Sequence, residues 1–167
     1  MAIAARRQPE PRRHEIAIVR IVDASPGDVF QAWIRPAHLS RWWGPRDFTT
    51  PHVTADPKPG GAFRTCIRSP RGDDYWASGT FREIEAPHRL VFTHAWDDEG
   101  EAEGDERVVT VKLAETDGKT RVAFHIGGFD SEASRDGEIE GWNECLDRLV
   151  RHFADGERAA TTEAQAG

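Results

Sequence analysis

The sequence has little of what marks membrane, secreted or zinc-binding proteins. Its 167 residues include two cysteines, one methionine and one tyrosine, without a C-x-x-C pair or a cysteine–histidine cluster at zinc-ligand spacing. No stretch approaches the roughly 18 apolar residues of a membrane span, and residues 1–13 lack the apolar centre of a signal peptide. We therefore expect a cytoplasmic protein without a membrane span, in which Cys66 and Cys145 are reduced and buried.

Motifs that carry catalysis or hold a cofactor are also missing. The chain has no G-x-S-x-G elbow, no glycine-rich phosphate loop and no H-E-x-x-H helix. His52, His94 and His125 fall on separate predicted strands, without a local pair of metal ligands. We expect no metal site and no cofactor.

Charge is confined to one segment. The net charge is -7, but residues 97–106 hold seven acids and no base, so acids and bases balance over the rest of the chain. A clustered basic face, which phosphate backbones require, is therefore lacking, and we expect no nucleic-acid partner. The acidic segment lacks the ordered spacing of a calcium loop and is predicted to be a solvated loop.

The apolar pattern divides the chain into one folded unit and two tails. Residues 1–13 and 155–167 lack an apolar pattern and are predicted to be disordered tails, which leaves residues 14–154 as the domain. The β-branched run 15–22 predicts a strand, and Ser25-Pro26 and then Pro36 open two short helices. Apolar residues at steps of three and four predict a long helix from about Arg135. Six further strands are predicted at 48–55, 61–68, 75–85, 89–96, 107–114 and 120–127.

This order of elements predicts an α+β fold. Strands in series joined by short turns form antiparallel hairpins, so the seven strands are expected to make one antiparallel sheet. The long C-terminal helix is the element able to cover its apolar face, and the sheet should curve around it. Strand 75–85 does not alternate cleanly: Trp76, Phe81 and Ile84 share a face only if the strand contains a bulge.

Four segments resemble a known family. They are D-A-S-P-x-x-V-F at 23–30, R-W-W-G-P at 41–45, K-P-G-G-x-F at 58–63 and G-W-N-E-C-L-D-R-L at 141–149. In these segments the chain resembles the activator of Hsp90 ATPase homologue family of the START-like (SRPBCC) superfamily. The resemblance implies the helix-grip (Bet v 1-like) fold, with a cavity between sheet and long helix that serves lipids, sterols or polyketides in the superfamily.

Aromatic residues supply the candidate cavity wall. The chain has six tryptophans and eight phenylalanines, which suit either a dense core or a pocket wall. On strand 89–96, Leu90, Phe92, His94 and Trp96 share one face, which we assign to the helix side, whereas His125 is expected to point outward. The candidate ligand-contact residues are Trp42, Trp43, Phe63, Trp76, Phe92, His94, Trp96, Phe124, Trp142 and Leu146.

Three functions follow from this pattern. The first is binding of a small apolar molecule, lipid-, sterol- or polyketide-like, without catalysis. The second is a cyclase or hydrolase that uses the same cavity, with His94 as the candidate acid or base. The third is a chaperone-linked or other protein-binding module, with the acidic loop as its contact. A homodimer through an exposed face of the sheet or helix also stays open.

Overall fold

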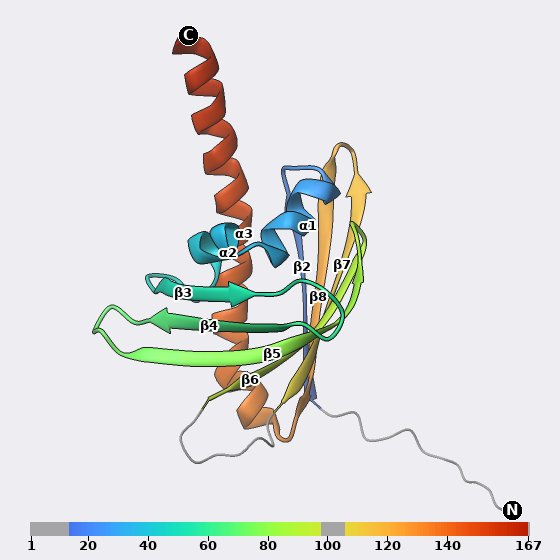
Figure 1. Cartoon of the computed structure of the whole chain (residues 1–167), viewed down its shortest axis with the longest axis vertical. Coiled ribbons are helices and arrows are strands. Elements are labelled where there is room, and N and C mark those ends of the chain that lie inside the picture. Colours follow the sequence, from blue (N-terminus) through green and yellow to red (C-terminus); the bar gives the residue numbers. More distant parts are fainter. Residues whose placement is uncertain (1–13, 98–105, 167) are drawn as a thin grey trace, which may run out of the picture.

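A computed structural model describes residues 14–97 and 106–166. Within these residues it contains three helices and a seven-stranded antiparallel sheet, in the order β2-β8-β7-β6-β5-β4-β3 (Figure 1). The predicted helix-grip fold is confirmed. In chain order the elements are β2 (His14–Val22), α1 (Pro26–Ile34), α2 (Pro36–Trp42), β3 (Thr49–Ala55), β4 (Ala62–Arg68), β5 (Asp74–Glu85), β6 (Arg89–Trp96), β7 (Arg107–Thr116), β8 (Lys119–Phe129) and α3 (Glu132–Ala166).

The sheet is strongly bent. Figure 1 shows β3, β4 and β5 running across the direction of β2, β7 and β8, with α3 passing along the sheet and α1 and α2 beside it. The acids at 98–105, between β6 and β7, lie outside the described residues. None of the helices in the described part of the chain combines the length and hydropathy needed to cross a membrane.

The starts of α1 and α3 follow from their caps. Ser25 precedes α1, and its hydroxyl accepts a hydrogen bond from the Asp28 amide at 3.3 Å, with Pro26 in the first helical position. At α3, the Ser131 hydroxyl accepts from the Ser134 amide at 3.0 Å. This cap starts α3 at Glu132 rather than at the predicted Arg135, because residues 131–135 carry a capping signal but no apolar periodicity.

The end of α3 also differs from the sequence-based expectation. The helix continues to Ala166, past the predicted start of a tail at residue 155. Residues 155–166 include four alanines and two glutamates, which are strong helix formers and extend a helix that is already nucleated. The domain limits at 14 and 154 stay a prediction.

The core lies between the concave face of the sheet and the helices. Buried residues alternate with less buried ones along β8, where Val122, Phe124 and Ile126 are buried, and the side chain of His125 is 45% exposed and bonded to Glu15. This confirms the predicted outward direction of His125. Leu146 and Leu149 of α3 close the core from the helix side and are fully buried.

A bulge in β5 resolves its irregular pattern. The pairing of β5 with β6 shifts register between Phe81 and Glu83, as the sequence predicts. Before the shift, Phe81 faces the core, and Trp76, five positions earlier, faces the other side. After the shift, Ile84 packs on the core. The strand therefore changes which alternate residues face the helix.

Candidate functional site

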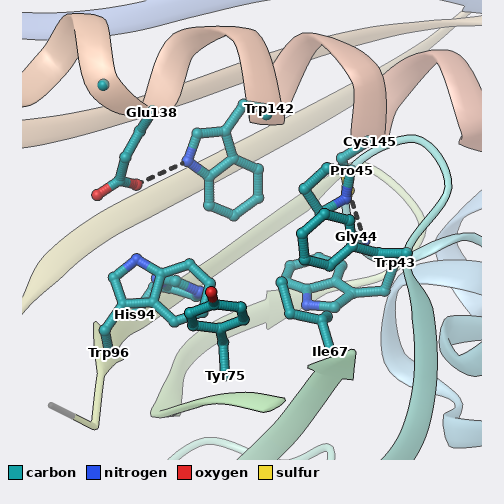
Figure 2. Close-up of a pocket in the computed structure, with 13 residues that line it drawn as sticks. Trp43, Gly44, Pro45, Ile67, Tyr75, His94, Trp96, Glu138, Trp142 and Cys145 are labelled. Atoms are coloured by element: carbon teal, nitrogen blue, oxygen red, sulfur yellow. Dashed lines mark hydrogen bonds between the residues drawn. The ribbon is translucent and has the colours of Figure 1, made fainter. Parts of the chain in front are cut away.

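A cavity of about 230 Å³ lies between α3, the segment after α2 and the strands β4, β5 and β6. Figure 2 shows its wall, in which aromatic rings face one another from the helix and the sheet. The residues around it are mostly apolar: Trp43, Gly44, Pro45, Phe48, Ile67, Tyr75, His94, Trp96, Gly137, Glu138, Gly141, Trp142 and Cys145. Such a lining suits an apolar molecule with few polar atoms.

The segment after α2 is held in place by α3. The Arg148 guanidinium donates hydrogen bonds to the carbonyls of Trp43, Gly44 and Pro45, each at 3.1 Å. The Thr50 hydroxyl donates to the same Trp43 carbonyl at 2.6 Å. Burial lowers the pKa of Arg148, but an arginine keeps its charge at neutral pH. These bonds fix the Trp43 ring at the cavity.

The Gly44 backbone needs its glycine. Its φ is +107°, a left-handed conformation that L side chains rarely adopt. A Cβ there would also lie 3.2 Å from Cγ2 of Ile67. The Gly44 amide donates to the Cys145 sulfur at 3.4 Å, which ties the turn to α3 a second time.

The face of α3 that borders the cavity carries small residues and one large aromatic ring. Gly137, Gly141 and Cys145 recur at four-residue spacing, so they share one helix face. A Cβ on Gly137 would have no neighbour within 4 Å, and one on Gly141 would lie 3.7 Å from Cγ of Pro45. The Trp142 ring stands beside them, and its indole N–H donates to Glu138 Oε1 at 3.1 Å (Figure 2).

His94 is the buried polar residue of the wall. Its ring centroid lies 5.2 Å from that of Trp96, 5.3 Å from Trp142 and 6.3 Å from Trp43. The residue is 2% exposed, and no described residue forms a hydrogen bond with its ring. Burial, and to a lesser degree the charge of Arg107, lowers the pKa of His94 to about 4. The imidazole is therefore neutral at pH 7, with one nitrogen to donate and one to accept.

Among the residues that the structure describes, no carboxylate or base is placed to activate His94 or a nucleophile. The Glu138 carboxylate accepts the Trp142 N–H, and no described carboxylate bonds to His94. Burial raises the pKa of the Cys145 thiol to about 12, so the thiolate that reacts is scarce at neutral pH. Among the described residues, no group of three or more histidines, cysteines or acids could hold a metal ion.

The structure brings together four of the ten predicted ligand-contact residues: Trp43, His94, Trp96 and Trp142. Phe63 and Phe92 line a separate small cavity of about 20 Å³. Trp42, Phe124 and Leu146 are buried in the core and are not among the lining residues. The Trp42 indole donates to the Ala32 carbonyl at 3.1 Å, which turns its polar edge toward α1.

Trp76 needs a correction, because it lies on the opposite face of the sheet. Its ring stacks on His52 at a centroid distance of 5.4 Å, and the Arg64 guanidinium lies 4.1 Å from its centre. The bulge in β5 comes after Trp76, so Tyr75 and not Trp76 points to the cavity. Tyr75 is 46% exposed and stands at the mouth.

The wall also contains residues that the sequence did not predict as ligand contacts. They are Gly44, Pro45, Phe48, Ile67, Tyr75, Gly137, Glu138, Gly141 and Cys145. The four-residue spacing of Gly137, Gly141 and Cys145 is visible in the sequence, as is the Glu138–Trp142 pair. Their meaning depends on which face of α3 meets the sheet. Small residues on a helix leave space for a cavity only where another part of the chain lies opposite that face.

Comparisons with known proteins agree with this fold. The family model described as Activator of Hsp90 ATPase homolog 1-like protein matches residues 23–154. A protein from Arthrobacter aurescens is 28% identical, with a TM-score of 0.76 over 84% of this chain and 86% of that chain. An AHSA1-like protein from Aeromonas hydrophila is 25% identical, with a TM-score of 0.71 over 86% of this chain and 94% of that one.

A more distant structure shows the same fold. The AHSA1 protein from Silicibacter pomeroyi is 23% identical, with a TM-score of 0.76 over 84% of this chain and 98% of that one. Proteins with curated descriptions give no match. Family model and fold together support a ligand-binding or other binding module in general.

Proposed function

The chain belongs to the Activator of Hsp90 ATPase homolog 1-like family, and from this premise we propose that it binds a small apolar molecule in the cavity beside α3. The observation that carries the proposal is the aromatic wall around about 230 Å³ of space. Trp43 of the segment after α2, Trp96 of β6 and Trp142 of α3 offer flat apolar faces. Each 100 Å² of ligand surface that leaves water there contributes about 2.5 kcal/mol, before the cost of ordering the ligand.

Rigidity of the wall favours binding. The Arg148 bonds to three successive carbonyls fix the segment that carries Trp43, and the Glu138 bond fixes the Trp142 ring. A wall that is already ordered loses little side-chain entropy when a ligand enters.

Binding without catalysis is the better supported form of this function. A general base works best with a pKa near the operating pH, whereas burial lowers that of His94 to about 4. Cys145 is held as a thiol by its raised pKa of about 12. Neither residue pairs with a described carboxylate that would orient or activate it.

Filling the cavity tests this proposal. In Gly141→Leu the new side chain points toward Pro45 and occupies the cavity. The matched control is Gly27→Leu in α1, where a Cβ has no neighbour within 4 Å. We expect equilibrium dialysis to give saturable 1:1 binding of 2-methylnaphthalene to the wild type and to Gly27→Leu. Affinity should fall at least tenfold in Gly141→Leu.

Two results would contradict the proposal. One is a wild-type protein that binds neither 2-methylnaphthalene nor its hydroxyl analogue 2-naphthol saturably, and the other is Gly141→Leu binding 2-methylnaphthalene as tightly as the control. Thermal unfolding of both variants checks their folding, because replacing glycine inside a helix should raise helix stability by up to about 1 kcal/mol. Native mass spectrometry with solvent extraction then identifies any molecule that the purified wild type retains.

A further inference from the structure

The size of the cavity limits the ligand. An engineered cavity of roughly 150 Å³ holds a single benzene ring, and drug-sized sites start at roughly 300 Å³. A space of about 230 Å³ lies between these values. It can enclose a molecule of two fused rings, whereas the four fused rings of a sterol would extend beyond it through the mouth at Tyr75.

The polar groups of the wall are mostly occupied. The Trp142 N–H is bonded to Glu138, the Gly44 amide to Cys145, and the Gly44 and Pro45 carbonyls to Arg148. Tyr75 at the mouth is 46% exposed, so its hydroxyl is within reach of water. A ligand oxygen at the buried end of the cavity therefore meets few groups that have bonding capacity left.

His94 is the group with that capacity. It is 2% exposed, it lines the cavity, and no described residue bonds to its ring. Its nitrogens are not among the fully enclosed atoms that lack a partner in the described part of the chain, so they border open space in which a ligand oxygen can form a hydrogen bond. The nearby indoles of Trp43 and Trp96 can only donate, whereas a neutral imidazole can either donate or accept.

The charges of the wall favour a neutral ligand. Within residues 14–97 and 106–166, the lining contains no lysine or arginine, and its carboxylate is Glu138. Arg107 pairs with His94 across β6 and β7, but its guanidinium lies over the Phe129 ring at 4.2 Å and is not part of the lining. An anion in the cavity would lack a cationic partner there.

Resting on the proposed function, we propose that the cavity selects a compact, neutral, two-ring aromatic molecule with a single hydroxyl or carbonyl oxygen. This oxygen forms a hydrogen bond with the His94 side chain at the buried end, while the rings pack against Trp43, Trp96 and Trp142. The specificity of the site thus depends on one hydrogen bond inside an apolar wall. Sites of this kind discriminate strongly against the analogue that lacks the polar atom.

Two isosteric probes test the inference. Equilibrium dialysis measures the affinities of 2-naphthol and 2-methylnaphthalene, which differ by a hydroxyl in place of a methyl group, for the wild type and for His94→Phe. The quantity of interest is the ratio of the two affinities, because effects of the variant on cavity shape largely cancel in it. We expect the preference for 2-naphthol to fall about tenfold in His94→Phe, the value of one hydrogen bond.

The wild type alone gives a second measurement if His94→Phe does not fold. If no group of the wall could bond to the hydroxyl, the protein would bind 2-methylnaphthalene more tightly, because burying an unbonded hydroxyl is costly. Tighter binding of 2-naphthol by the wild type therefore supports the inference. An unchanged ratio in His94→Phe, or a wild-type preference for 2-methylnaphthalene, overturns the inference and leaves the proposed function intact. Saturable binding of neither probe overturns both.

Discussion

The buried His94 makes the stability of the folded protein depend on pH. Its pKa is about 4 in the folded state and 6.5 as the reference for an exposed histidine. Between these values the unfolded chain binds a proton that the folded chain does not, so stability is lost as the pH falls from about 6.5. Below about pH 4 both states carry the proton and the loss ends.

The size of this loss of stability follows from the difference between the pKa values of His94 in the folded and unfolded states. At about 1.4 kcal/mol per pH unit, the free energy of unfolding should fall by about 2 kcal/mol between pH 7.5 and pH 5, and by about 3 kcal/mol by pH 4. His94 is 2% exposed, so screening by solvent takes little from this value. Against a typical total stability of about 5–15 kcal/mol, the loss is large.

Urea unfolding of the wild type and of His94→Phe measures this pH-dependent loss of stability. Other groups also titrate over this range, so the relevant quantity is the difference between the two proteins at each pH. We expect that difference to change by about 3 kcal/mol in favour of His94→Phe between pH 7.5 and pH 4. The exposed His14, replaced in His14→Gln, serves as the control and should follow the wild type. Parallel curves for the wild type and His94→Phe would refute the reasoning.

Two further predictions concern the walls of the site. Arg148→Leu removes the donor that three backbone carbonyls share; those of Trp43 and Pro45 keep bonds from Thr50 and from the Phe48 amide, so the Gly44 carbonyl is the one left without a donor. The variant should lower the free energy of unfolding by about 1–3 kcal/mol in urea titrations, and an unchanged midpoint would contradict the role of the guanidinium. Trp96→Ala should weaken the binding of 2-methylnaphthalene in equilibrium dialysis. Trp76→Ala changes a ring on the opposite face of the sheet and should leave this affinity unchanged. Equal losses of affinity in both variants would contradict the assignment of faces.

Much of the fold was predictable because it depends on local signals. Ser25-Pro26 starts α1 by capping, and the β-branched runs match the strands to within two residues. Alternation along strand 89–96 correctly placed Phe92 and His94 on the helix side, where Phe92 joins the core and His94 lines the cavity. The four family-like segments extended these local signals to the topology of the whole domain.

The cavity wall was less predictable because it depends on register. Trp76 lies outside the cavity and Tyr75 at its mouth, because the pairing of β5 shifts only after Phe81. The sequence predicted the bulge but not its position, and one residue of register exchanges the two faces of a strand. Trp42 and Trp43 are adjacent in sequence, yet only Trp43 reaches the cavity, because the Trp42 indole is bonded to Ala32.

The sequence by itself therefore determined the α+β class, the antiparallel pairing of the strands and the number of aromatic residues available for a wall, since these depend on spacing and residue type along the chain. Only the tertiary structure decided which rings face one another, that Gly137 and Gly141 leave room opposite them, and that His94 is buried at the cavity. A cavity is a gap between segments far apart in sequence, and its volume depends on how the helix sits on the sheet.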